Sequence, residues 1–135
     1  MSWKEDFDKV LELASFLQRS NVADIEFSSG HVLEVRLALT KDERVRGLAF
    51  LNELDLSGLL FCYDTPTYIP YTMKDTNHDL DIAWFDEDGK LIQSGTYKAR
   101  STEHITCPSA FSYVLETPAG TLPAGDIKFK AESVG

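Results

Sequence analysis

The stretch PYTMKDTNHDLDIAWFD, residues 70–86, decides the fold, because it places a cluster of polar groups directly before an apolar run. Residues 80–85 are rich in side chains that favour β-structure and predict a strand. Side chains alternate along a strand, so Asp81 shares a face with Phe85. A carboxylate in such a place is costly unless it is paired, and we therefore expect Asp81 to have a partner.

Composition limits the class of protein. A chain of 135 residues is long enough for one core, and its net charge of −9 disfavours binding to nucleic acid or to an anionic membrane. Cys62 and Cys107 are too few for a disulfide framework, which favours two free thiols over one bridge. The sequence shows neither a secretory signal nor an apolar run of the ~20 residues that a membrane span needs. These features predict a cytoplasmic protein.

The first 20 residues predict an amphipathic helix, separate from a mainly β domain at residues 21–135. Ser2 and Glu5 form a capping box, and apolar residues recur at steps of three and four. This helix could pack on its own domain or dock, through residues 2–19, on a protein partner or a second copy of the chain. The large aromatic side chains favour docking. The predicted partner-binding residues are Trp3, Phe7, Val10, Leu11 and Leu17.

The rest of the chain predicts antiparallel strands. Residues 31–39 alternate between apolar and polar side chains, and Asp and Gly residues between 84 and 92 predict a hairpin. A second capping box at Thr40 predicts a short internal helix. The expected fold class is α+β, mainly antiparallel β. We expect a compact, barrel-like single domain with an N-terminal helix and one short internal helix.

No phosphate-binding loop, nucleophile elbow or zinc pattern is present, and no cofactor or metal is predicted. His78 with Asp79 and Asp81 makes a poor metal site, because in a strand His78 would point away from both aspartates. The candidate ligand-binding residues are Arg44, Lys74, Asp75, Thr76 and Asp81. They are interpreted either as a structural polar network, with Arg44 or Lys74 pairing Asp81, or as the floor of a small-molecule site.

The chain resembles the family catalogued as domain of unknown function 192 (DUF192). The similarity covers roughly residues 22 to 130 and rests on five blocks, at residues 37–48, 58–61, 73–76, 80–89 and 113–120. By this resemblance Met73, Lys74 and Thr76 match a Met-Lys-Asn-Thr block, and Asp81 matches its following Leu-Asp pair. Thr40, Glu43, Arg44 and Gly47 match the first block. Asp75 replaces the family's asparagine and Asp79 its proline.

The resemblance implies a compact, mostly β domain without an established activity. Our first hypothesis is a non-enzymatic binding or assembly module that docks through its N-terminal helix, as would suit a component of a bacteriophage particle. The alternative is a small-molecule-binding protein or an uncharacterised enzyme with a pocket around residues 73–76. The absence of a recognisable catalytic constellation in the sequence favours a protein that is not an enzyme.

Overall fold

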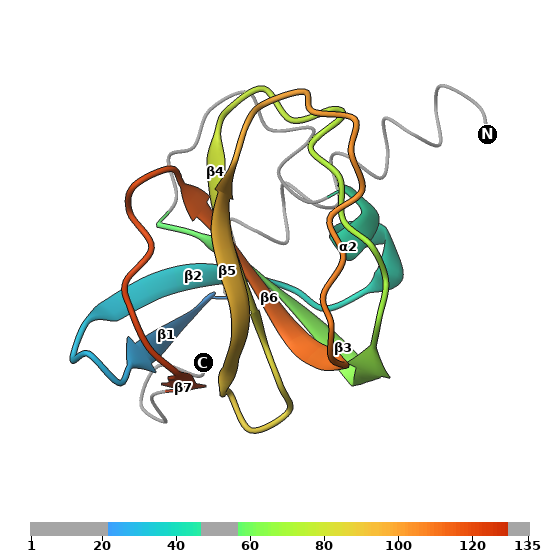
Figure 1. Cartoon of the computed structure of the whole chain (residues 1–135). Coiled ribbons are helices and arrows are strands. Elements are labelled where there is room, and N and C mark those ends of the chain that lie inside the picture. The colour runs from blue at the N-terminus through green and yellow to red at the C-terminus, as the bar shows by residue number, and fades with distance from the viewer. Residues whose placement is uncertain (1–21, 47–56, 130–135) are drawn as a thin grey trace.

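Seven strands build nearly all the regular structure of the computed structural model, which describes residues 22–46 and 57–129. They form one curled sheet in the order β5-β4-β6-β3-β2-β1-β7 (Figure 1). Their bounds are β1 (Val22–Phe27), β2 (Val32–Ala38), β3 (Leu59–Thr67), β4 (Leu80–Phe85), β5 (Leu91–Tyr97), β6 (Phe111–Pro118) and β7 (Ile127–Phe129).

The predicted α+β class is wrong, because the described residues are nearly all β. The helix that these ranges contain, α2 (Lys41–Arg46), has six residues and is too short to form a layer on the sheet. The sheet is also an open half-barrel, with β5 and β7 as its two edge strands, and not a closed barrel. The predicted N-terminal helix at residues 2–19 lies outside the described residues.

Two pairs of strands form hairpins, and most of the other pairs join strands that are not consecutive in the sequence. β1 pairs with β2, and β4 pairs with β5, both antiparallel. β2 and β3 are parallel, which requires a crossover connection, and residues 39–58 supply it. β6 lies between β4 and β3 and is antiparallel to both. β6 contributes to the cores on both faces of the sheet, with Val114 on one face and Leu115 on the other.

Each face of the sheet has its own core. On the first, which we call the aromatic face, Trp84 and Phe111 pack with partly buried tyrosines against the segments that precede β4 and follow β5. The opposite face holds Ile25, Phe27, Phe85 and Leu115. β4 is buried along its whole length, as the apolar run at residues 80–85 predicts.

The two edges of the sheet meet at one end. Ile127 N donates to Gly89 O at 2.8 Å, and Leu91 N donates to Asp126 Oδ1 at 2.9 Å. Gly89 has φ +81°, and a Cβ at this position would lie 2.1 Å from Ile127 O. The contact therefore needs glycine, and it holds the sheet in its curl.

Among the described residues, no helix is long and apolar enough to span a membrane.

Candidate functional site

Asp81 and Glu116 are the two buried carboxylates of the described residues, each 7% exposed. Asp81 Oδ1 accepts a hydrogen bond from Thr96 Oγ1 at 2.6 Å. Its Oδ2 accepts from the backbone nitrogens of Gly120 at 2.9 Å and Leu122 at 3.1 Å. The prediction that Asp81 has a partner is confirmed, and its partners tie β4 to β5 and to the turn after β6. Asp81 is therefore a structural residue.

Glu116 differs, because no hydrogen bond or charge from the described residues stabilises its carboxylate. It lies on β6 between Leu59 of β3 and Ile82 of β4, on the aromatic face. Burial raises the pKa of Glu116 to about 8. Below that pH the side chain is mainly a neutral acid, which can both donate and accept a hydrogen bond.

Two tyrosines and an arginine lie on the same face as Glu116. The hydroxyl oxygens of Tyr63 and Tyr71 are 2.6 Å apart. The guanidinium carbon of Arg44 lies 4.7 Å from the Tyr63 ring centroid, and Arg44 Nη1 donates to the carbonyls of Leu39 at 2.6 Å and Cys62 at 2.7 Å. Burial raises the pKa of both tyrosines; Glu116 raises both further, and Arg44 opposes the rise.

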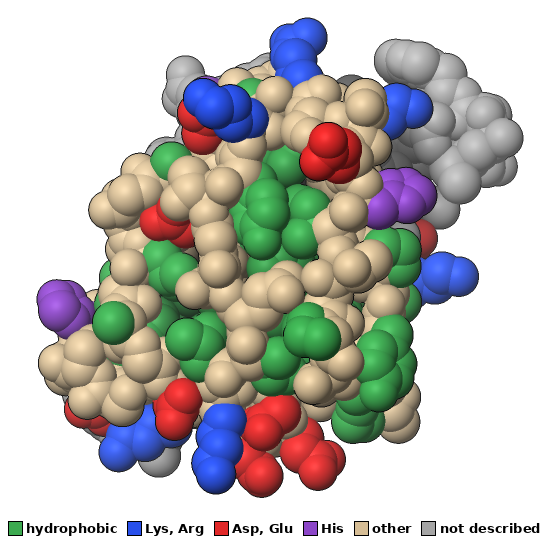
Figure 2. Space-filling view, viewed as in Figure 1, with side chains coloured by type: hydrophobic (Ala, Val, Ile, Leu, Met, Phe, Trp, Pro, Cys, Tyr) green, Lys and Arg blue, Asp and Glu red, His purple; other side chains and the backbone are tan. Residues whose placement is uncertain are grey.

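A hollow of about 310 Å³ opens on the aromatic face between β5 and the segment that follows it. Figure 2 shows hydrophobic side chains at its floor, surrounded by backbone and by other side chains. The residues that line it are Met73, Gln93, Tyr97, Lys98, Ser101, Glu103, His104, Ile105 and Thr106. Its volume suits a small ligand, and its lining combines apolar surface with a few polar groups.

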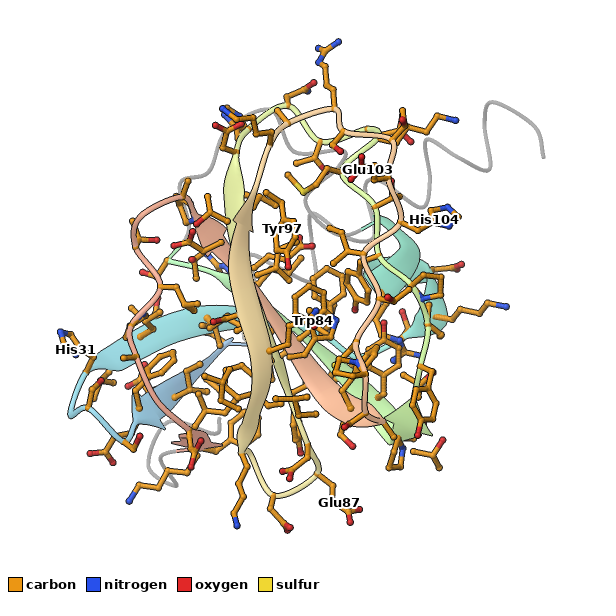
Figure 3. All side chains as sticks on the ribbon, viewed as in Figure 1. His31, Trp84, Glu87, Tyr97, Glu103 and His104 are labelled. Atoms are coloured by element: carbon orange, nitrogen blue, oxygen red, sulfur yellow. The ribbon has the colours of Figure 1, made fainter. Side chains whose placement is uncertain are left out.

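Tyr97 supplies an aromatic wall of this hollow, and its position is fixed by its neighbours. Its ring lies edge-on to Trp84, with centroids 6.0 Å apart, and both residues lie between β5 and the segment that carries Glu103 and His104 (Figure 3). A Cβ on residue 95 would lie 2.9 Å from the Tyr97 hydroxyl, so Gly95 makes room for the ring. Gln93 Nε2 donates to Thr106 O at 3.0 Å and joins β5 to the facing segment.

The structure does not gather the residues predicted from the sequence into one pocket. Arg44 and Asp81 have other partners, as described above, and the predicted pair between them does not form. Lys74 and Asp75 are exposed in a turn, and the buried Thr76 lies in the segment that connects this turn to β4. Met73 reaches the hollow and is 1% exposed. The predicted partner-binding residues, Trp3, Phe7, Val10, Leu11 and Leu17, lie outside the described residues.

Sequence reasoning missed Glu116 and Tyr97. The signal for Glu116 was present, because it shares its parity on the strand with Val114 and therefore points into an apolar core. Tyr97 closes a predicted strand, and nothing in the local sequence indicates that a hollow lies beside it.

Neither a metal site nor an activated thiol emerges from residues 22–46 and 57–129. They contain no group of three or more His, Cys, Asp and Glu side chains that could hold a metal ion. Cys62 and Cys107 are free thiols. Burial raises the pKa of Cys62 to about 12, with Arg44 opposing the rise, which disfavours the thiolate that a nucleophile would need.

Comparisons with known proteins identify relatives of the fold. A family model, DUF192, described as "Uncharacterized ACR", matches residues 24–132. A protein of unknown function from Novosphingobium aromaticivorans is 24% identical, with a TM-score of 0.69, and the match covers 79% of this chain and 83% of that one. A Sinorhizobium meliloti protein, provisionally described as a transcription regulator, is 25% identical, with a TM-score of 0.70 and coverage of 80% and 92%. No curated protein gives a significant match.

Proposed function

The chain belongs to the DUF192 family, whose model matches most of its length, and we propose that it is a small-molecule-binding protein that takes its ligand into the hollow beside β5. The observation that carries this proposal is a concave site of about 310 Å³ with an aromatic wall already held in place. A site that is rigid before binding loses less conformational entropy when a ligand arrives.

The chemistry of the lining supports a ligand with one flat apolar part and a few polar groups. Tyr97 offers a ring, Met73 a thioether and Ile105 an aliphatic surface. Lys98 and Glu103 place opposite charges on the lining, so no single ligand charge is favoured there. No group of the hollow is arranged as a nucleophile with a base, which favours binding over catalysis.

A screen of small aromatic compounds by ligand-observed NMR tests this proposal, followed by mapping of the bound compounds onto backbone amides. We expect shifts at residues 97–106 and a large loss of affinity in Tyr97→Ala. Tyr113→Ala is the matched control, because Tyr113 is also a half-buried tyrosine but lies against Phe129 on the opposite face. Equal binding by wild type and Tyr97→Ala, or shifts confined to other surfaces, would contradict the proposal.

Docking through residues 2–19, on a partner, a second copy or a phage particle, stays a prediction from the amphipathic pattern alone. Deleting residues 1–20 should abolish assembly and leave a folded domain. Native mass and circular dichroism of the truncated chain test this. If the truncated chain had the same oligomeric state and the same partners as the full chain, the docking role would be ruled out.

A further inference from the structure

The rim of the hollow is held in place by the segment that precedes β4. Arg100 N donates to Met73 O at 3.0 Å and to Thr76 O at 3.1 Å. Tyr71 and Ile105 exchange two backbone hydrogen bonds, of 2.9 and 2.7 Å. The segment that follows β5 supplies most of the lining and is therefore fixed to a neighbouring segment before any ligand binds.

Two side chains of opposite charge border the hollow without neutralising each other. Lys98 and Glu103 are both exposed, and both line it. Within the described ranges, neither charged group forms an ion pair or a hydrogen bond. His104 lies on the outer side of its segment, away from Tyr97 (Figure 3), so Lys98 and Glu103 supply the charges that a ligand meets.

Below this charged rim the lining is apolar. A Cβ on residue 95 would lie 2.9 Å from the Tyr97 hydroxyl, so the ring is laid along β5 and does not project from it. The buried Met73 and the half-buried Ile105 add thioether and aliphatic surface. A ligand can therefore pack a ring on this surface while its polar end stays at the rim.

We propose that the ligand of the hollow is a zwitterion, an α-amino acid with an aromatic side chain. Its ring packs beside Tyr97, its carboxylate pairs with Lys98 and its ammonium group pairs with Glu103. This inference rests on the proposed function, because it names the class of ligand that the hollow takes. The volume of about 310 Å³ is near the lower end of the ~300–1,000 Å³ of small-molecule sites, which suits a ligand of this size.

The two charges together disfavour singly charged analogues of the same shape. An amine without the carboxylate leaves Lys98 without a partner, and an acid without the ammonium group leaves Glu103 without one. Because exposed ion pairs are weak and are screened by salt, each pair should improve the affinity by about two- to fivefold. The packing of the ring is common to all three compounds and does not contribute to the difference.

L-phenylalanine is the probe, with 2-phenylethylamine and 3-phenylpropionate as analogues that each lack one of its charges. NMR titrations at neutral pH give the three dissociation constants from shifts at residues 97–106. We expect wild type to bind L-phenylalanine about two- to fivefold more tightly than either analogue. Sodium chloride at about 1 M should reduce this preference, because it screens the charges and leaves the packing of the ring intact.

Two variants assign the charges. Lys98→Ala should abolish the preference over 2-phenylethylamine and keep the preference over 3-phenylpropionate, and Glu103→Gln should do the reverse. Lys90→Ala and Glu87→Gln are the matched controls, because both residues are exposed in the hairpin between β4 and β5 and do not line the hollow. Both controls should keep both preferences.

Three results would overturn this inference: binding of either analogue as tightly as L-phenylalanine by wild type, unchanged preferences in both Lys98→Ala and Glu103→Gln, or shifts by L-phenylalanine confined to other surfaces. The proposed function survives each of them if other aromatic compounds bind the hollow and Tyr97→Ala weakens them. If no aromatic compound shifts residues 97–106, the proposed function and this inference both fail.

Discussion

At the scale of single residues, Asp81 and Glu116 show that equal burial does not imply equal roles. Both are 7% exposed on strands of the same sheet. The Asp81 carboxylate accepts hydrogen bonds from three donors, whereas no such donor among the described residues reaches Glu116, and burial raises the pKa of Glu116 to about 8. The difference between the two residues therefore lies in the hydrogen bonds that each carboxyl group receives, and not in the depth of its burial.

The raised pKa of Glu116 predicts that stability falls as pH increases. Below an ordinary glutamate pKa of about 4.5 both the folded and the unfolded states hold the proton, and the residue costs nothing. Between about 4.5 and about 8 only the folded state keeps it, so each pH unit lowers the free energy of unfolding by up to about 1.4 kcal/mol. Glu116→Gln should therefore be the more stable protein near neutral pH, by roughly 2–4 kcal/mol.

Urea denaturation of wild type and Glu116→Gln at about pH 5 and about pH 8 measures this difference. Glu34→Gln serves as the control, since its exposed carboxylate should leave the slope with pH unchanged. If wild type and Glu116→Gln lost stability equally over this range, the buried carboxyl would not be the cause.

Gly95 and Tyr97 form a second pair of linked residues. Burial raises the pKa of Tyr97, and the space that holds its ring exists because residue 95 has no Cβ. In Gly95→Ala the ring must move outward, which should bring the Tyr97 pKa back toward its ordinary value and weaken ligands of the hollow. Tyrosine ionisation is followed by ultraviolet titration in Gly95→Ala and in the double variant Gly95→Ala, Tyr97→Phe. The difference between the two curves is the titration of Tyr97, which is compared with the same difference between wild type and Tyr97→Phe. An unchanged Tyr97 titration would contradict the account.

At the scale of elements, β4 connects the parts of the sheet. It pairs with β5 on one side and β6 on the other, and Asp81 extends this connection to the turn after β6. The backbone nitrogens of Gly120 and Leu122 depend on this one carboxylate oxygen. The polar segment before β4 adds to this connection, because Asp79 Oδ1 accepts from Ala99 N after β5 and Asp79 O accepts from Ala119 N after β6.

Asp81→Ala should destabilise the protein by about 3 kcal/mol, because it leaves two backbone donors and the Thr96 hydroxyl without their acceptor. The matched variant is Asp75→Ala, whose exposed carboxylate should contribute less than about 0.5 kcal/mol. Chemical denaturation of both variants gives the comparison. Similar losses in the two variants would show that the Asp81 hydrogen bonds do not hold the turn.

At the scale of the whole molecule, the curl of the sheet depends on the contact between its two edges. β5 and β7 are at opposite ends of the strand order, yet Gly89 and Ile127 meet through a backbone hydrogen bond. This contact brings the hairpin between β4 and β5 against β7 and closes one end of the half-barrel.

Gly89→Ala should therefore destabilise the fold by several times as much as Gly30→Ala. Both glycines have positive φ, +81° and +96°, so alanine is strained at either position by roughly 1–2 kcal/mol. A Cβ at position 89 would also overlap Ile127 O, whereas one at position 30 meets nothing within 4 Å. Thermal unfolding of the two variants separates closure of the sheet from the cost of φ. Equal melting temperatures would show that the edge contact contributes little.

The sequence by itself determined the local features of this protein: the strand at residues 80–85, the hairpin after it, the family, and the need of Asp81 for a partner. Only the tertiary structure decided which groups bind Asp81, since the three donors lie 15, 39 and 41 residues away from it along the chain. It likewise decided that Glu116 has no partner among the described residues and that a hollow lies beside Tyr97. The physical reason is that alternation of side chains assigns each residue to a face, whereas the strands that pair, and the groups that meet on a face, depend on contacts between distant segments.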